Sequence, residues 1–195
     1  VIAPALEFVT RDFALGPFMQ GVAVSSVLFG GFVGALLAGG LIRRTGERPT
    51  LLATAILFAV GGVGAAVSES FLPWLLWRTV TGLGVGAATM VAPLYVSETV
   101  PPRVRGALVS IIQLTITLGI LASYLAGAVW TPTQAWQPML LIGAAPAVLL
   151  LLITLAVPES PRWYLLHGRR AEAERAHSRL SGGQGDLAEV GRAGE

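Results

Sequence analysis

The chain has 195 residues, of which 54% are hydrophobic and only 12% are charged. Soluble domains usually carry about 25% charged residues, so this composition argues against an ordinary soluble protein and is typical of a membrane protein. The formal net charge of +2 is too small to indicate a nucleic-acid partner, and the absence of cysteine excludes disulfides and thiolate chemistry.

The apolar residues form five runs that are long enough to cross a bilayer, which takes about 20 residues per helix. Backbone polar groups in lipid must be satisfied within their own segment, so each run is predicted to be a helix. A short apolar piece at 1–9, VIAPALEFV, is interpreted as the end of an earlier helix, and the chain as a fragment of a longer protein. The predicted spans are 18–42, 50–67, 71–96, 107–130 and 138–157, which together with the first piece form a transmembrane half-bundle over 1–157.

The segment after the last span changes character. Residues 158–180 are charged and amphipathic, and they are predicted to form a short cytoplasmic helical segment. Residues 181–195 are rich in glycine and polar side chains, which predicts a disordered tail.

The arginines predict the orientation of the chain. Three lie in the loop at 42–49, two in the loop at 98–106 and six after residue 157, whereas the loops on the other side hold one at most. Because positive loops stay in the cytoplasm, the chain is predicted to be a multi-pass protein of the cell membrane with a cytoplasmic tail from about residue 158.

Four stretches carry a family resemblance. They are RTVTGLGVGA at 78–87, PLYVSETVPPRVRGALVS at 93–110, QLTITLGI at 113–120 and PESPRWYL at 158–165. In this order and spacing they resemble the sugar porter family of the major facilitator superfamily. The resemblance implies an all-α, integral membrane bundle that comprises the end of helix 1 and helices 2–6, followed by a short cytoplasmic helix.

The loop at 39–49, GGLIRRTGERP, departs from the family pattern GxxxDRxGRR. Gly39, Gly46 and Arg48 match this pattern, but Arg43 replaces the usual Asp and Glu47 replaces an Arg. The resemblance implies that an Asp at this position helps to latch the two halves of the carrier, and in this chain Arg43 stands in its place.

Arg78 lies about seven residues into its predicted span, roughly 10 Å from the span's start at 1.5 Å per residue. A charge at the bilayer centre costs at least about 2.5–3.5 kcal/mol, and such residues usually face a cavity or a counter-ion. The resemblance implies a role in proton coupling, beside an acid of the first helix that would lie upstream of Val1. The alternative is that Arg78 extends to the nearer membrane interface.

Five glycines lie inside the first and third predicted spans. Small residues let membrane helices approach closely, so these positions are predicted to pack helices together and not to bind phosphate. The positions are Gly30, Gly34, Gly82, Gly84 and Gly86.

Gln113 is a polar residue inside the fourth predicted span, and Thr117 lies one turn further along. The resemblance implies that Gln113 binds a sugar hydroxyl, because an amide both donates and accepts hydrogen bonds, and that Thr117 lines the same cavity. The alternative for Gln113 is a hydrogen bond between helices.

Five charged residues near the predicted cytoplasmic ends of the spans are assigned to one set. The resemblance implies a gating network that ties the helix ends to each other and to a second half, whereas the alternative is solvated loop charges worth about 0–1 kcal/mol each. The residues are Arg48, Glu98, Arg105, Glu159 and Arg162.

The function implied is secondary active or facilitative transport of a sugar or polyol by alternating access, within a longer twelve-helix carrier. Its partners would be the lipid bilayer, the solute, the carboxy-terminal half and protons. Two alternatives stay open: a major facilitator carrier for a non-sugar small solute, and a non-transporting truncated remnant.

No catalytic constellation, metal site or cofactor motif is present in the sequence, so the chain is predicted not to be an enzyme.

Overall fold

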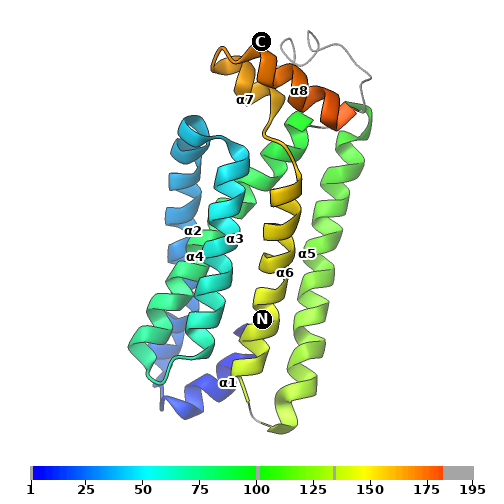
Figure 1. Ribbon diagram of the computed structural model, residues 1–195. Helices are drawn as coiled ribbons and strands as arrows, with labels where there is room; N and C mark the ends of the chain where they lie inside the picture. Colours follow the sequence, from blue (N-terminus) through cyan, green and yellow to red (C-terminus); the bar gives the residue numbers. More distant parts are fainter. Residues whose placement is uncertain (1, 100–101, 134, 182–195) are drawn as a thin grey trace.

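The computed structural model describes all residues except 1, 100–101, 134 and 182–195 (Figure 1). The described residues form helices and contain no strand. The helices are α1 (Ile2–Asp12), α2 (Pro17–Thr45), α3 (Glu47–Ala66), α4 (Phe71–Thr99), α5 (Pro102–Trp130), the 3-10 turn η1 (Thr131–Thr133), α6 (Gln137–Ala156), α7 (Pro161–Leu166) and α8 (Arg170–Ser181).

Five of these helices, α2 to α6, are long and apolar enough to cross a membrane. Several extend beyond the apolar runs: α2 continues through Arg43 and Arg44, and α4 continues past residue 96 to Thr99. Hydropathy marks the part of a helix that suits lipid, whereas the backbone hydrogen bonds continue until a residue such as Gly46 breaks them. Ser181 is the last residue of α8, and the rest of the predicted disordered tail lies outside the described residues.

The helices α2 to α6 run side by side, with short helices at both ends (Figure 1). At one end, called here the α8 end, lie α7, α8 and the connection between α2 and α3. At the opposite end, called the α1 end, lie α1 and the connections between α3 and α4 and between α5 and α6. The arginines at 43–44 and those of the tail helix therefore lie at the same end of the bundle.

The helix α4 packs against both α2 and α3, and α3 also packs against α6. Aromatic rings close the α1 end: Phe13 lies 6.3 Å from Phe71, 6.5 Å from Trp74 and 5.9 Å from Trp136, measured between ring centroids. A hydrogen bond of 2.8 Å from Trp136 Nε1 to Asp12 Oδ2 joins α1 to the start of α6.

Candidate functional site

Arg78 is buried in the α1-end half of α4, with 8% of its surface exposed. Its Nε has no hydrogen-bond partner, and no carboxylate pairs with it among the described residues. The guanidinium carbon lies 5.7 Å from the ring centroid of Trp74, a residue that is itself fully buried. The structure thus places a cation inside an apolar helix, with an aromatic face as its neighbour and no counter-ion within the described part of the chain.

The glycines at the contact between α2 and α4 leave no room for a side chain. A Cβ at Gly30 would overlap the carbonyl of Thr79, and one at Gly34 would overlap the carbonyl of Leu83. On the opposite helix, a Cβ at Gly82 would overlap the carbonyl of Val27. Backbone therefore meets backbone along this contact.

Two further glycines of α4 also lie at helix contacts. A Cβ at Gly86 would overlap the carbonyl of Gly31 on α2, whereas one at Gly84 would lie 3.0 Å from Thr54 O and from Phe58 N on α3. The i, i+2, i+4 spacing of the three α4 glycines thus serves two neighbours, because Gly82 and Gly86 face α2 and Gly84 faces α3.

Gln113 and Thr117 lie one turn apart on an exposed face of α5. The Thr117 hydroxyl donates a hydrogen bond of 3.1 Å to Gln113 O, so its oxygen remains available as an acceptor. No hydrogen bond, ion pair or ring contact of the described residues joins either of them to Arg78.

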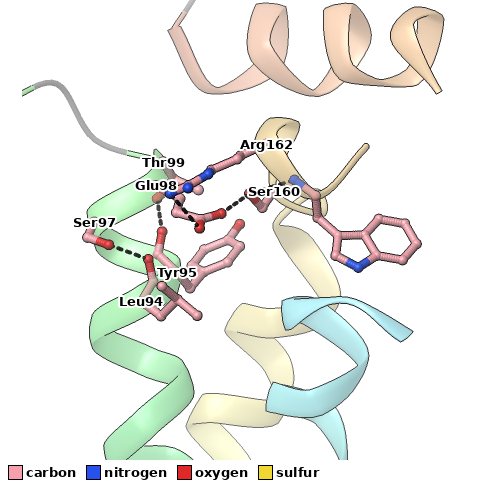
Figure 2. A network of polar contacts seen from close by, with 8 residues as sticks. Leu94, Tyr95, Ser97, Glu98, Thr99, Ser160 and Arg162 are labelled. Atoms are coloured by element: carbon pink, nitrogen blue, oxygen red, sulfur yellow. Dashed lines mark hydrogen bonds and ion pairs between the residues drawn. The ribbon is translucent and has the colours of Figure 1, made fainter. Parts of the chain in front are cut away.

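Glu98, at the end of α4, binds the start of α7 (Figure 2). Its Oε2 accepts a hydrogen bond of 2.7 Å from Ser160 Oγ, and its Oε1 lies 3.3 Å from Arg162 Nη1 in a salt bridge. Ser160 also caps α7, because its Oγ accepts a hydrogen bond from Trp163 N. These contacts connect α4 to the segment after α6.

Glu159 caps the start of α3. Its carboxylate accepts backbone hydrogen bonds of 3.0 Å from the N–H groups of Glu47 and Arg48, and another of 3.0 Å from its own neighbour Ser160. A negative group at a helix N-terminus is stabilised by the unpaired N–H groups and the helix dipole.

Gly46 makes this cap possible. Its φ is +101° and its ψ is 174°, a conformation that side chains rarely adopt, and a Cβ there would overlap the Glu159 carboxylate. The glycine therefore serves both the tight turn between α2 and α3 and the approach of the carboxylate.

Arg48 binds backbone and not a carboxylate. Its Nε donates a hydrogen bond of 3.1 Å to Thr154 O, and its Nη2 donates one of 3.0 Å to Leu155 O. These carbonyls lie at the end of α6, where they have no partner within the helix. Of the five charged residues assigned to one set, Glu98 and Arg162 form an ion pair, Glu159 and Arg48 cap helix ends, and the side chain of Arg105 lies outside the described residues.

Sequence reasoning gave no role to three residues at the α8 end. Tyr95 donates a hydrogen bond of 2.7 Å to Pro158 O, and Trp163 Nε1 donates one of 3.1 Å to Ile42 O. Glu47 is buried with 2% of its surface exposed, and its Oε2 has no hydrogen-bond partner. Tyr95 and Trp163 belong to the quoted motifs, so the motifs were the signal that could have found them.

Local ion pairs lie on the exposed face of α8 and at its start. Arg169 lies 3.0 Å from Glu172, and Arg170 lies 3.3 Å from Glu174. The hydrogen bond from Arg169 lowers the pKa of Glu172. Within the part of the chain that the structure describes, no three His, Cys, Asp or Glu residues are grouped to hold a metal ion.

Comparison with known proteins identifies the family to which this chain is similar. The family model described as "Sugar (and other) transporter" matches residues 14–192. The chain is 42% identical over 174 residues to the arabinose-proton symporter of Escherichia coli (strain K12), covering 89% of this chain and 37% of that protein. It is 41% identical over 180 residues to the galactose-proton symporter of the same strain, covering 92% of this chain and 39% of that protein.

Solved structures also show similarity to sugar transporters. The major facilitator proton:xylose symporter XylE, in complex with 6-bromo-6-deoxy-D-glucose, superposes with a TM-score of 0.82 at 29% identity. The superposition covers 98% of this chain and 47% of the symporter chain. The chain thus spans about 40% of the length of these curated relatives and about half of the solved structure.

Proposed function

The chain belongs to the sugar (and other) transporter family, and from this premise we propose that it supplies the amino-terminal half of a sugar carrier. Family membership confirms the predicted resemblance to sugar porters, the all-α bundle of a multi-pass membrane protein and the prediction that the chain is not an enzyme. The match over residues 14–192 is the observation that carries the proposal.

The proposed transport is alternating access, in which this half-bundle and a second one rock about a shared solute site. Gln113 and Thr117 are proposed as solute ligands because they present an amide and a hydroxyl on an exposed face of α5. An amide and a hydroxyl suit the alternating donors and acceptors of a sugar. The relatives named above act on arabinose, galactose and xylose, which supports a pentose or hexose as the solute.

Proton coupling is proposed to involve Arg78. The residue is buried without a carboxylate partner among the described residues, so an acid that approaches it would gain a strong, weakly screened interaction. Protonation of that acid would release the arginine and link proton movement to solute movement. The printed names of the relatives as proton symporters support this assignment.

The contacts at the α8 end are proposed to form part of a cytoplasmic gate. Glu98, Arg162 and Ser160 already join α4 to α7, and a second half would compete for these groups when the gate closes. The tail from about residue 158 is proposed to lie in the cytoplasm, because its arginines share the α8 end with Arg43 and Arg44.

The test is uptake of radiolabelled pentoses and hexoses by cells that express this chain alone and by cells that express it within its complete reading frame. We expect uptake from the complete reading frame only, and loss of accumulation when an uncoupler is added. Absence of uptake in both, with protein present in the membrane, would support the remnant. Uptake of another small solute but not of sugars would support the non-sugar carrier.

Coupling is tested with Arg78→Lys and Arg78→Leu in the complete reading frame. We expect both variants to lose uncoupler-sensitive accumulation, because the guanidinium geometry and its fixed charge are both needed. Unaltered accumulation in both variants would overturn the role of Arg78 and leave the transport proposal standing.

A further inference from the structure

A groove of about 580 Å³ lies between α2, α3 and α4 in the half of the bundle nearest the α8 end. Leucine, alanine and glycine form most of its lining, and Arg43 and Arg44 are the charged residues among its described lining. This volume falls within the range of about 300–1,000 Å³ that is usual for small-molecule sites.

The wall of the groove is apolar even where it contains threonine. The Thr50 hydroxyl donates a hydrogen bond of 2.7 Å to Gly46 O, and the Thr54 hydroxyl donates one of 2.8 Å to Thr50 O. Open space lies beside Gly40, where an added Cβ would meet no atom within 4 Å. The groove therefore offers apolar surface and room for an apolar chain.

The two arginines, Arg43 and Arg44, lie at the end of the groove. Both are exposed, and neither forms an ion pair with a described residue. The nearest acid along the chain, Glu47, is buried with 2% of its surface exposed, and no salt bridge joins it to either arginine among the described residues. Two positive charges are thus available to an anion from outside the chain.

The length of the groove fits one leaflet of a bilayer. Its lining runs along α2 from Gly34 to Arg44, which is about 15 Å at 1.5 Å per residue. The hydrocarbon core of a bilayer is about 30 Å thick, so each leaflet contributes about half of that. An acyl chain that lies along the groove would bring its headgroup to the arginines.

We propose that this groove binds a phospholipid with an anionic headgroup, with one acyl chain against α2, α3 and α4 and the phosphate at Arg43 and Arg44. Basic pockets between membrane helices at the cytoplasmic side hold anionic headgroups in this way. The site is separate from the proposed solute residues on α5, so it stands or fails independently of sugar transport.

The test is native mass spectrometry of the purified chain in detergent, titrated with phosphatidylglycerol and with phosphatidylcholine of the same acyl chains. We expect the chain to prefer phosphatidylglycerol. The double variant Arg43→Gln/Arg44→Gln should lose about 30-fold of that preference, which corresponds to about 2 kcal/mol for two arginines. The matched control Arg175→Gln/Arg179→Gln, on α8, removes the same charge at the same end and should keep the preference.

The apolar part of the site is tested with Gly40→Leu, which fills the open space in the groove. We expect retention of both lipids to fall at least tenfold. Gly119→Leu on α5 is the control, because a Cβ there also meets no atom within 4 Å and the position lies outside the groove. It should retain both lipids as the unaltered chain does.

Three outcomes would overturn the proposal. Equal retention of the two lipids by the unaltered chain would indicate that the groove binds a neutral lipid or a protein helix and does not select an anionic headgroup. Full displacement of phosphatidylglycerol by soluble glycerol 1-phosphate would indicate an anion site without a role for the groove. Unchanged retention in Gly40→Leu would exclude the acyl chain from the groove.

Discussion

The helices α4 and α5 have the same length, 29 residues each, but opposite environments. The helix α4 is held between α2 and α3 through Gly82, Gly84 and Gly86, whereas α5 is exposed along most of its length. Two glycines of α5, Gly106 and Gly119, have open space where their Cβ would lie. Both helices are therefore hydrophobic enough to lie in lipid. The spacing of their small residues determines which of them packs closely against neighbouring helices.

The largest expected difference between the two helices comes from Gly86→Val and Gly119→Val. The first variant forces a side chain against the carbonyl of Gly31, so it should lose about 3 kcal/mol of stability or more. The second should remain within about 0.5 kcal/mol of the unaltered chain. Thermal unfolding in detergent, followed by tryptophan fluorescence, measures both, and equal melting temperatures would contradict the comparison.

The second-largest effect on stability is expected from replacing one polar residue in each of the two helices. Arg78→Leu should stabilise the chain by about 2 kcal/mol, because it removes a buried cation that costs about 2.5–3.5 kcal/mol and loses a cation–π contact of about 1 kcal/mol. Gln113→Leu, on the exposed face of α5, should change stability by less than about 0.5 kcal/mol. Unfolding in lipid nanodiscs measures both, and a destabilised Arg78→Leu would reveal a partner of Arg78.

A smaller effect is expected where α4 is anchored at its end. Glu98→Gln weakens the contacts to Ser160 and Arg162, and the loss should be about 1 kcal/mol because Arg162 is partly exposed. Glu174→Gln, which removes an exposed ion pair on α8, is the control and should cost less than about 0.5 kcal/mol. A larger loss in the control than in Glu98→Gln would show that the anchor of α4 contributes nothing.

The smallest effect on stability is expected for Gln113→Ala, within about 0.5 kcal/mol. The same variant, in the complete reading frame, should weaken sugar binding by about fivefold to tenfold, the loss of one hydrogen bond of about 1 kcal/mol. Thr115→Ala is the matched control, since its hydroxyl is exposed on the same helix and is bonded to Ile111 O. Equal affinity in Gln113→Ala would remove this residue from the proposed solute site.

Patterns within one helix could be read from the sequence, but contacts between distant helices could not. The glycine spacing in α4 lies within a single run, so helical geometry alone places Gly82 and Gly86 on one face. The bonds from Arg48 to Thr154 O and Leu155 O join residues more than 100 positions apart, with separations of 106 and 107. Periodicity carries no information on which helix end lies beside which. The sequence therefore predicts that Arg48 ties helix ends together, but not that its partners are the backbone carbonyls at the end of α6.

The same limit applies to Glu47, whose departure from the family pattern was visible but whose burial was not. Its position follows from the turn at Gly46 and from the approach of Glu159, which lies between the end of α6 and the start of α7. Arg78 lies between these cases. Its place inside an apolar run predicts a special role, and the i, i+4 spacing from Trp74 places the two side chains on one face of α4. The burial of both side chains depends on the neighbouring helices, which the spacing does not give.

The carboxylate of Glu159 joins two separate stretches of backbone, the start of α3 and its own turn after α6. If α3 and α6 were pulled apart at this end, the N–H groups of Glu47 and Arg48 would lose their acceptor together, each with its own desolvation cost. The ends of α3 and α6 are therefore coupled through this one side chain. A large displacement of one helix at this end is expected to move the other helix with it.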